Sequence, residues 1–161
     1  MLVVGACGGG GDDAVAGACG EEVVAPVDPQ SAVHVLPGAP EADDRPALPT
    51  SGIHVMDPGV DVVASEPLAA SVAVGVLERR GIVVEYSPDL ASGDRQSLEA
   101  LATEDQGTVV VAPAPDLPSP IVARAWQTRL DCTSLDVGRL EAFVDDHLGT
   151  GSAMDPATTA E

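Results

Sequence analysis

The 161-residue sequence contains no lysine and only one tryptophan, one tyrosine and one phenylalanine. Because aromatic residues make up 2% of the chain, a folded core has to be aliphatic and thin. The seven basic residues, all arginine, are outnumbered by 26 acidic ones, giving a formal net charge of −19. Such a surface repels phosphate backbones and argues against nucleic acid as a partner. It also repels anionic lipids, so membrane attachment would need a lipid chain rather than a basic patch.

Long apolar runs and the common catalytic motifs are missing as well. No stretch reaches the roughly 18 apolar residues that a membrane-spanning helix requires. The sequence has no Gly-x-Ser-x-Gly, no dinucleotide-binding fingerprint, no zincin pattern and no Gly-Lys-Ser/Thr phosphate loop. These absences favour a non-enzymatic protein.

The beginning of the chain carries a lipidation motif. Val4-Gly5-Ala6-Cys7 resembles the lipobox of bacterial lipoproteins, with an aliphatic residue and two small ones before the cysteine that takes the lipid. The apolar run before Cys7 is short for a signal peptide and no charged segment precedes it. Either the natural start codon lies upstream, which we expect, or the motif is a chance match. We predict a truncated signal and flexible tether over 1–18, one domain over 19–149 and a disordered tail over 150–161.

Three cysteines are an odd number for an exported protein. The count is explained if Cys7 carries a lipid and Cys19 pairs with Cys132. This disulfide would close a loop of roughly 110 residues and contribute about 4–5 kcal/mol in the chain-entropy model. The alternative is a catalytic thiol at Cys132, just before a predicted helix, although no Cys-x-x-Cys is present.

The pattern of apolar residues predicts an α+β fold with a small mixed sheet, about three packed helices and a long irregular N-terminal wrap. The wrap, 28–67, is rich in Pro, Gly, Asp and Ala. Ile121–Cys132 reads as one long strand, with a helix as its rival, and Thr133-x-x-Asp136 resembles a capping box. The other expected elements are an edge strand at Val23–Val27, helices at Pro67–Arg80 and Ser92–Asp105, strands at Ile82–Tyr86 and Thr108–Ala112, and a helix from Val137 that ends at Gly149.

The order of several short motifs resembles a known family. HVLPG, LPTSGIHV, GVLERRGIVVEYSPDL and VVVAPAPDLPSPIVARAWQTRLDC follow one another as in the bacterial family catalogued as domain of unknown function 3105. The resemblance covers about Cys19 to Gly149 and implies an exported or membrane-anchored protein with no established activity. The family's His-x-Leu-Glu-His-Gly pattern falls on Gly75, Leu77, Glu78 and Arg79 here, so two imidazoles are missing. If that pattern binds a metal, the resemblance implies that this chain has lost the site.

Three residues remain as candidate metal ligands: His34, His54 and Glu78. Two imidazoles and a carboxylate suit zinc or iron. Met56, close to His54 in sequence, could add a thioether ligand if the metal is copper. Alternatively, both histidines bond to loop backbone and hold the wrap in place, and a hydrolase using Glu78 and His54 is a third reading. No His-x-x-x-His spacing supports a metal site.

The sequence therefore predicts an extracytoplasmic, lipid-anchored or secreted protein of the cell envelope. We expect a non-enzymatic interaction module that reaches the membrane through a lipid on Cys7 and binds an envelope protein, without cofactor. The alternative is a divergent metal-binding protein that handles copper or zinc.

Overall fold

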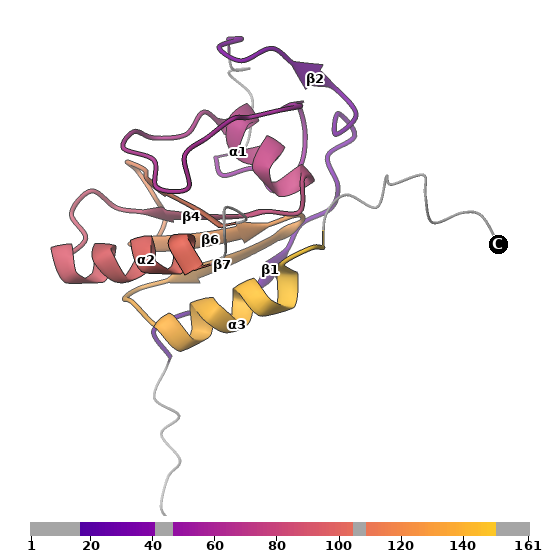
Figure 1. Ribbon diagram of the computed structural model, residues 1–161. Coiled ribbons are helices and arrows are strands. Elements are labelled where there is room, and N and C mark those ends of the chain that lie inside the picture. The colour runs from indigo at the N-terminus through magenta and orange to yellow at the C-terminus, as the bar shows by residue number, and fades with distance from the viewer. Residues whose placement is uncertain (1–16, 41–46, 105–108, 151–161) are drawn as a thin grey trace, which may run out of the picture.

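The computed structural model describes residues 17–40, 47–104 and 109–150. A five-stranded mixed sheet lies between helix α1 on one face and helices α2 and α3 on the other (Figure 1). A second sheet of two short strands lies beside α1, and the α+β prediction is confirmed. The elements are β1 (Val23–Val24), β2 (His34–Val35), β3 (His54–Val55), α1 (Ala70–Glu78), β4 (Ile82–Tyr86), α2 (Ser92–Glu104), β5 (Val109–Pro113), β6 (Ile121–Ala125), β7 (Thr128–Cys132) and α3 (Val137–His147).

The main sheet has the strand order β1-β7-β6-β4-β5. Strands β4 and β5 are parallel and are connected through α2, because parallel neighbours require a crossover. The remaining pairs, β4 with β6, β6 with β7 and β1 with β7, are antiparallel. Every residue of β4 is buried, which agrees with its β-branched sequence IVVEY and with its central position.

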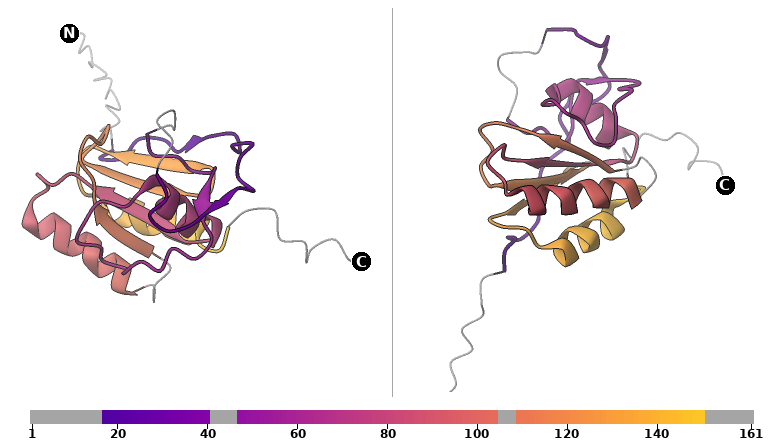
Figure 2. Two further views of the ribbon diagram at one scale, coloured as in Figure 1. Left: turned by 90° about the horizontal axis from the view of Figure 1, so that it is seen from above. Right: turned by 60° about the vertical axis from the view of Figure 1, so that its left-hand side comes forward.

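The helices on the two faces of the sheet (Figure 2) enclose two separate clusters of buried apolar residues. The face toward α2 and α3 holds the larger core, in which Phe143 and Leu140 of α3 pack with Leu98 of α2. The face toward α1 holds a smaller core around Val83, Val110 and Trp126. Aliphatic residues dominate both cores, as the shortage of aromatic residues predicts.

Helix α1 lies unusually close to the two-stranded sheet. A Cβ atom added to Gly75 would collide with the carbonyl oxygen of Val55, so only glycine fits at this contact. A glycine at position 81 suggests a helix whose C-cap is Arg80, but the C-cap is Arg79, one residue earlier. Arg80 takes the left-handed conformation at φ 68°, and the N–H groups of Arg80 and Gly81 donate to the carbonyl oxygens of Leu77 and Val76 in a Schellman motif.

The prediction of one long strand at Ile121–Cys132 is wrong, and so is its helical rival. The segment folds back as the β6–β7 hairpin, with Trp126 and Gln127 in the turn and Gln127 at φ 62°. Because the turn has two residues, Ala125 pairs with Thr128, and the odd-numbered face of β6 continues as the even-numbered face of β7. Ala123 and Leu130 therefore face α2 and α3, whereas Arg124 faces α1.

The predicted capping box at Thr133 is also wrong. Asp136 caps α3, since its side chain accepts a hydrogen bond from the N–H of Arg139 at 3.0 Å. Thr133 instead donates through its N–H and hydroxyl groups to the carbonyl oxygen of Ala18, at 2.7 and 3.0 Å. The helix ends before Gly149 as predicted, and Gly149 has a φ of 80°.

The part of the chain before α1 contributes strands to both sheets. Strand β1 pairs with β7 at one edge of the main sheet, as predicted for Val23–Val27 although shorter. At the opposite edge Val63 forms a parallel bridge with Val111 of β5. Between these contacts, β2 and β3 form the separate parallel pair that lies against α1. The predicted tail except Thr150, and most of the predicted tether including Cys7, lie outside the described residues.

Candidate functional site

A disulfide joins Cys19 to Cys132, as the cysteine count predicts. Cys132 is the last residue of β7 and is fully buried. Flanking backbone hydrogen bonds from Gly20 to Asp131 and from Thr133 to Ala18, at 2.9 and 2.7 Å, hold the N-terminal segment beside β7. Because its sulfur is bonded to Cys19, Cys132 offers no thiolate, and the alternative of a catalytic thiol is wrong.

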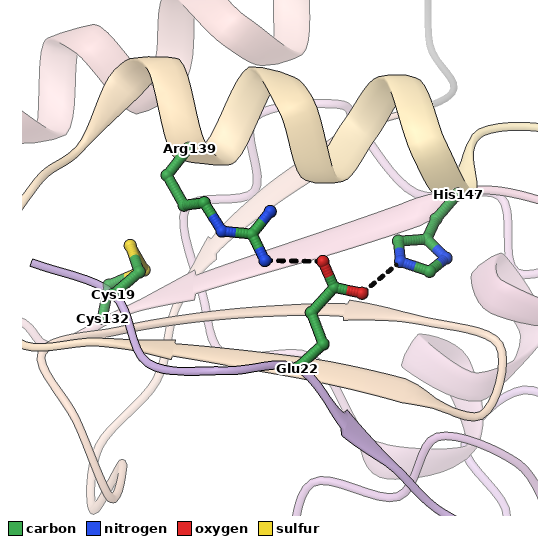
Figure 3. A network of polar contacts seen from close by, with 5 residues as sticks. All are labelled: Cys19, Glu22, Cys132, Arg139 and His147. Atoms are coloured by element: carbon green, nitrogen blue, oxygen red, sulfur yellow. Dashed lines mark hydrogen bonds and ion pairs between the residues drawn. A yellow bond between two sulfur atoms is a disulfide. The ribbon is translucent and has the colours of Figure 1, made fainter. Parts of the chain in front are cut away.

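A carboxylate just after the disulfide ties the same segment to α3 (Figure 3). Glu22 accepts a hydrogen bond from Arg139 at 2.6 Å and contacts Nε2 of His147 at 2.7 Å. The hydrogen bond from His147, followed by that from Arg139, holds the pKa of Glu22 below its usual range. The sequence predicts only that His147 suits the C-terminal end of a helix. Its partner is 125 residues away, and no local pattern indicates it.

The structure brings together two of the predicted metal ligands, His34 and His54. They are directly paired in the register of β2 and β3, and their rings meet edge to face with centroids 4.6 Å apart. His54 is 1% exposed, whereas His34 is exposed to solvent. The two histidines are 20 residues apart in sequence. They meet because the chain between them loops back and places β3 parallel to β2.

The ring of His54 is held in one orientation. Its Nδ1 lies 2.9 Å from the carbonyl oxygen of Gly52, and since a carbonyl only accepts, Nδ1 carries the proton. In the neutral ring the second nitrogen, Nε2, then has a free lone pair. That atom is buried and has no hydrogen-bond partner among the described residues.

The third predicted ligand, Glu78, is half-buried at the C-terminal end of α1. Within the described ranges no group of three or more His, Cys, Asp or Glu residues is arranged to hold a metal ion. The geometry therefore supports His34 and His54 as neighbouring candidate ligands and gives no support to Glu78 as a third. The three-ligand metal site stays a prediction.

A buried ion pair crosses the α1 face of the main sheet. Nη2 of Arg124 lies 2.7 Å from Oε2 of Glu85, and Nη1 donates to the carbonyl oxygen of Pro49 at 2.8 Å. Burial lowers the pKa of Arg124, while the adjacent Glu85 carboxylate opposes that shift. The pair forms because β6 runs antiparallel to β4, with Arg124 opposite Val83 and Glu85 two residues further along the same face.

Of the open hollows on this face, two share the segment Ala47–Pro49 as part of their lining. The larger, about 410 Å³, is lined mostly by apolar residues from two segments, 23–29 and 47–51, including Val23, Pro26 and Val27, and also by Arg129. The smaller, about 340 Å³, has Glu85 and Arg124 in its wall. Val23 and Val24 of the edge strand β1 are 51% and 74% exposed beside the larger hollow.

Comparison with known proteins gives one match. Residues 45–161 match a family model described as "Protein of unknown function (DUF3105)", and this match covers more than half of the chain. No curated protein and no solved structure gives a significant match. Among the described residues, no helix combines the length and apolarity needed to cross a bilayer.

Proposed function

The chain belongs to the DUF3105 family of proteins of unknown function, and we propose that it is an extracytoplasmic, lipid-tethered interaction module of the bacterial cell envelope. The Cys19–Cys132 disulfide is the observation that carries this proposal. Structural disulfides persist in oxidising compartments and are rare in the cytosol of most organisms. With the other two cysteines paired, Cys7 is left for a lipid.

The tether limits how far the domain can be from the membrane. Cys19 lies twelve positions after Cys7, and a fully extended chain spans at most about 3.3–3.6 Å per residue. A lipid on Cys7 would keep the domain within about 40 Å of the bilayer surface. The net charge of −19 would at the same time keep it from lying flat on anionic lipids.

The edge of the main sheet at β1 is the surface we assign to a partner. The exposed valines of β1 and the apolar hollow of about 410 Å³ beside them suit an extended segment that adds a strand to the sheet. Because the module is strongly acidic, we expect a neutral or basic partner segment. No catalytic group is required for this role.

Intact-mass analysis of protein extracted from native membranes tests the tether. We expect a protein that begins at Cys7, carries a diacylglycerol and lacks the two hydrogens of a dithiol. A photo-crosslinking residue at Val24 tests the surface. It should give a discrete adduct with another envelope protein in intact cells, whereas the same residue at Ala100 on α2, also exposed, should not. An unlipidated Cys7, or equal crosslinking at both positions, would contradict the proposal.

A further inference from the structure

From the contact between His34 and His54 we infer that these two imidazoles, with the thioether of Met56, form a low-coordinate site for Cu(I). The site lies on the lobe made by β2 and β3 (Figure 1). The copper site involves neither the disulfide nor the β1 edge. A failed test of the copper site therefore leaves the proposed tether and partner surface unaffected, and the reverse also holds.

His54 has the arrangement of a prepared metal ligand. A metal-bound histidine almost always donates its other ring N–H to a carbonyl or carboxylate, which fixes the tautomer. His54 does so through the 2.9 Å contact between Nδ1 and the oxygen of Gly52. Its Nε2 is left as a buried acceptor without a partner among the described residues, which is unfavourable unless a ligand occupies the lone pair. A metal ion satisfies that nitrogen without rotating the ring.

His34 supplies the second nitrogen. The chain has three histidines, and two of them are in ring contact at 4.6 Å. His34 is exposed, so its ring can turn about its own side-chain bonds to direct a nitrogen toward Nε2 of His54 while the strand pairing stays in place. The ring contact therefore places a solvent-exposed imidazole directly against the buried one.

The thioether of Met56 and the small number of ligand atoms favour Cu(I) over zinc. Met56 follows His54 by two residues, and its side chain is exposed although it is large and apolar. Zinc sites use three or four nitrogen, sulfur or carboxylate ligands, and the described residues contain no such group of three. Two imidazoles and a thioether are instead a soft, small ligand set, which suits Cu(I).

Anaerobic titration of the full-length protein with Cu(I), in competition with bicinchoninate, tests this inference. We expect one equivalent to bind, and binding to weaken by about tenfold or more in His34→Ala and in His54→Ala. Met56→Leu should weaken it less and should remove the Cu–S contribution to the X-ray absorption spectrum. His147→Ala is the matched control, because it deletes the remaining imidazole, and it should bind like the unsubstituted protein.

Nitrogen NMR of the imidazoles provides a readout that does not depend on His54→Ala folding. In the metal-free protein His54 should show the tautomer with the proton on Nδ1. Addition of Ag(I) as a probe for Cu(I) should shift the nitrogens of His34 and His54 and leave those of His147 unchanged. The inference is overturned if no stoichiometric site is found, if His147→Ala weakens binding as much as His34→Ala does, or if Ag(I) leaves the two rings unaffected.

Discussion

The two faces of the main sheet differ in what covers them. On one face, α2 and α3 close over a continuous aliphatic core, and the disulfide and the Glu22 contacts fasten the N-terminal segment beside them. On the other, the nine-residue helix α1 covers a smaller core and leaves a buried ion pair, open hollows and the histidine pair in the wrap. The first face holds more of the apolar core, and the second holds the buried polar groups from which the metal site is inferred.

The largest effect should come from the disulfide, because it joins residues 113 positions apart. We expect the double variant Cys19→Ser/Cys132→Ser to lose about 4–5 kcal/mol of unfolding free energy, mainly through a freer unfolded chain. Urea denaturation of the oxidised protein and the variant measures the loss. The reduced, unsubstituted protein is the control and should match the variant. A loss of unfolding free energy well under about 1 kcal/mol would show that the disulfide contributes little to the stability of this face.

On the α1 face, removal of one member of the ion pair should cost nearly as much. Glu85→Ala leaves the buried Arg124 charge without its carboxylate, and we expect a loss of about 3–5 kcal/mol. The double variant Glu85→Leu/Arg124→Met should be close to the unsubstituted protein in stability, because it leaves no buried charge. Chemical denaturation of both variants measures this difference. If the double variant is as unstable as Glu85→Ala, the ion pair contributes net stability to the α1 face, and the expectation that the two buried charges only neutralise each other is wrong.

The end of α1 offers a smaller, stabilising change. Arg80 lies in the left-handed region, which costs a non-glycine residue about 1–2 kcal/mol. Part of that is offset by the greater freedom of glycine in the unfolded chain, so Arg80→Gly should stabilise the protein by about 0.5–1 kcal/mol. Arg79→Gly is the matched control, since Arg79 has a φ of −82°, and it should be destabilising. Thermal melts of the two variants should move in opposite directions.

The smallest effect concerns the Glu22 contacts and depends on pH. The pKa of Glu22 is lowered in the folded protein, so its contribution is complete above the ordinary glutamate pKa of about 4.3 and is lost as the pH falls through the lower folded value. Because the group is partly exposed, we expect under about 1 kcal/mol. Glu22→Gln should remove this pH dependence in denaturation series between pH 3 and 6, with Glu141→Gln on α3 as an exposed control. Identical profiles for Glu22→Gln and the unsubstituted protein would contradict the assignment.

The parts that the sequence predicts well are those where local pattern and tertiary structure agree. Ile82–Tyr86 is found with the predicted bounds, because a β-branched run between a helix end and a Ser-Pro turn has few other ways to fold. The disulfide followed from counting sulfur atoms. The hairpin at Trp126 and Gln127 was missed because the turn contains no Gly, Asn or Asp, and the left-handed residue is a glutamine.

The site was predicted less well because its contacts depend on register. Glu85 meets Arg124 only because β6 runs antiparallel to β4, and His34 meets His54 only because the wrap returns beside its own first strand. Neither pairing leaves a periodic pattern in the sequence. The choice of His34 and His54 as candidate ligands is consistent with their ring contact, whereas the choice of Glu78 as the third ligand has no geometric support among the described residues.

The central claim is that the three cysteines have different roles, with one attached to lipid and the other two joined at the end of β7. Peptide mapping by mass spectrometry of the protein taken directly from its membrane tests it in one measurement. We predict a Cys7 peptide that carries a diacylglycerol, together with a crosslinked peptide that contains Cys19 and Cys132. An unmodified Cys7, or Cys19 and Cys132 recovered as free thiols after alkylation, would contradict the account.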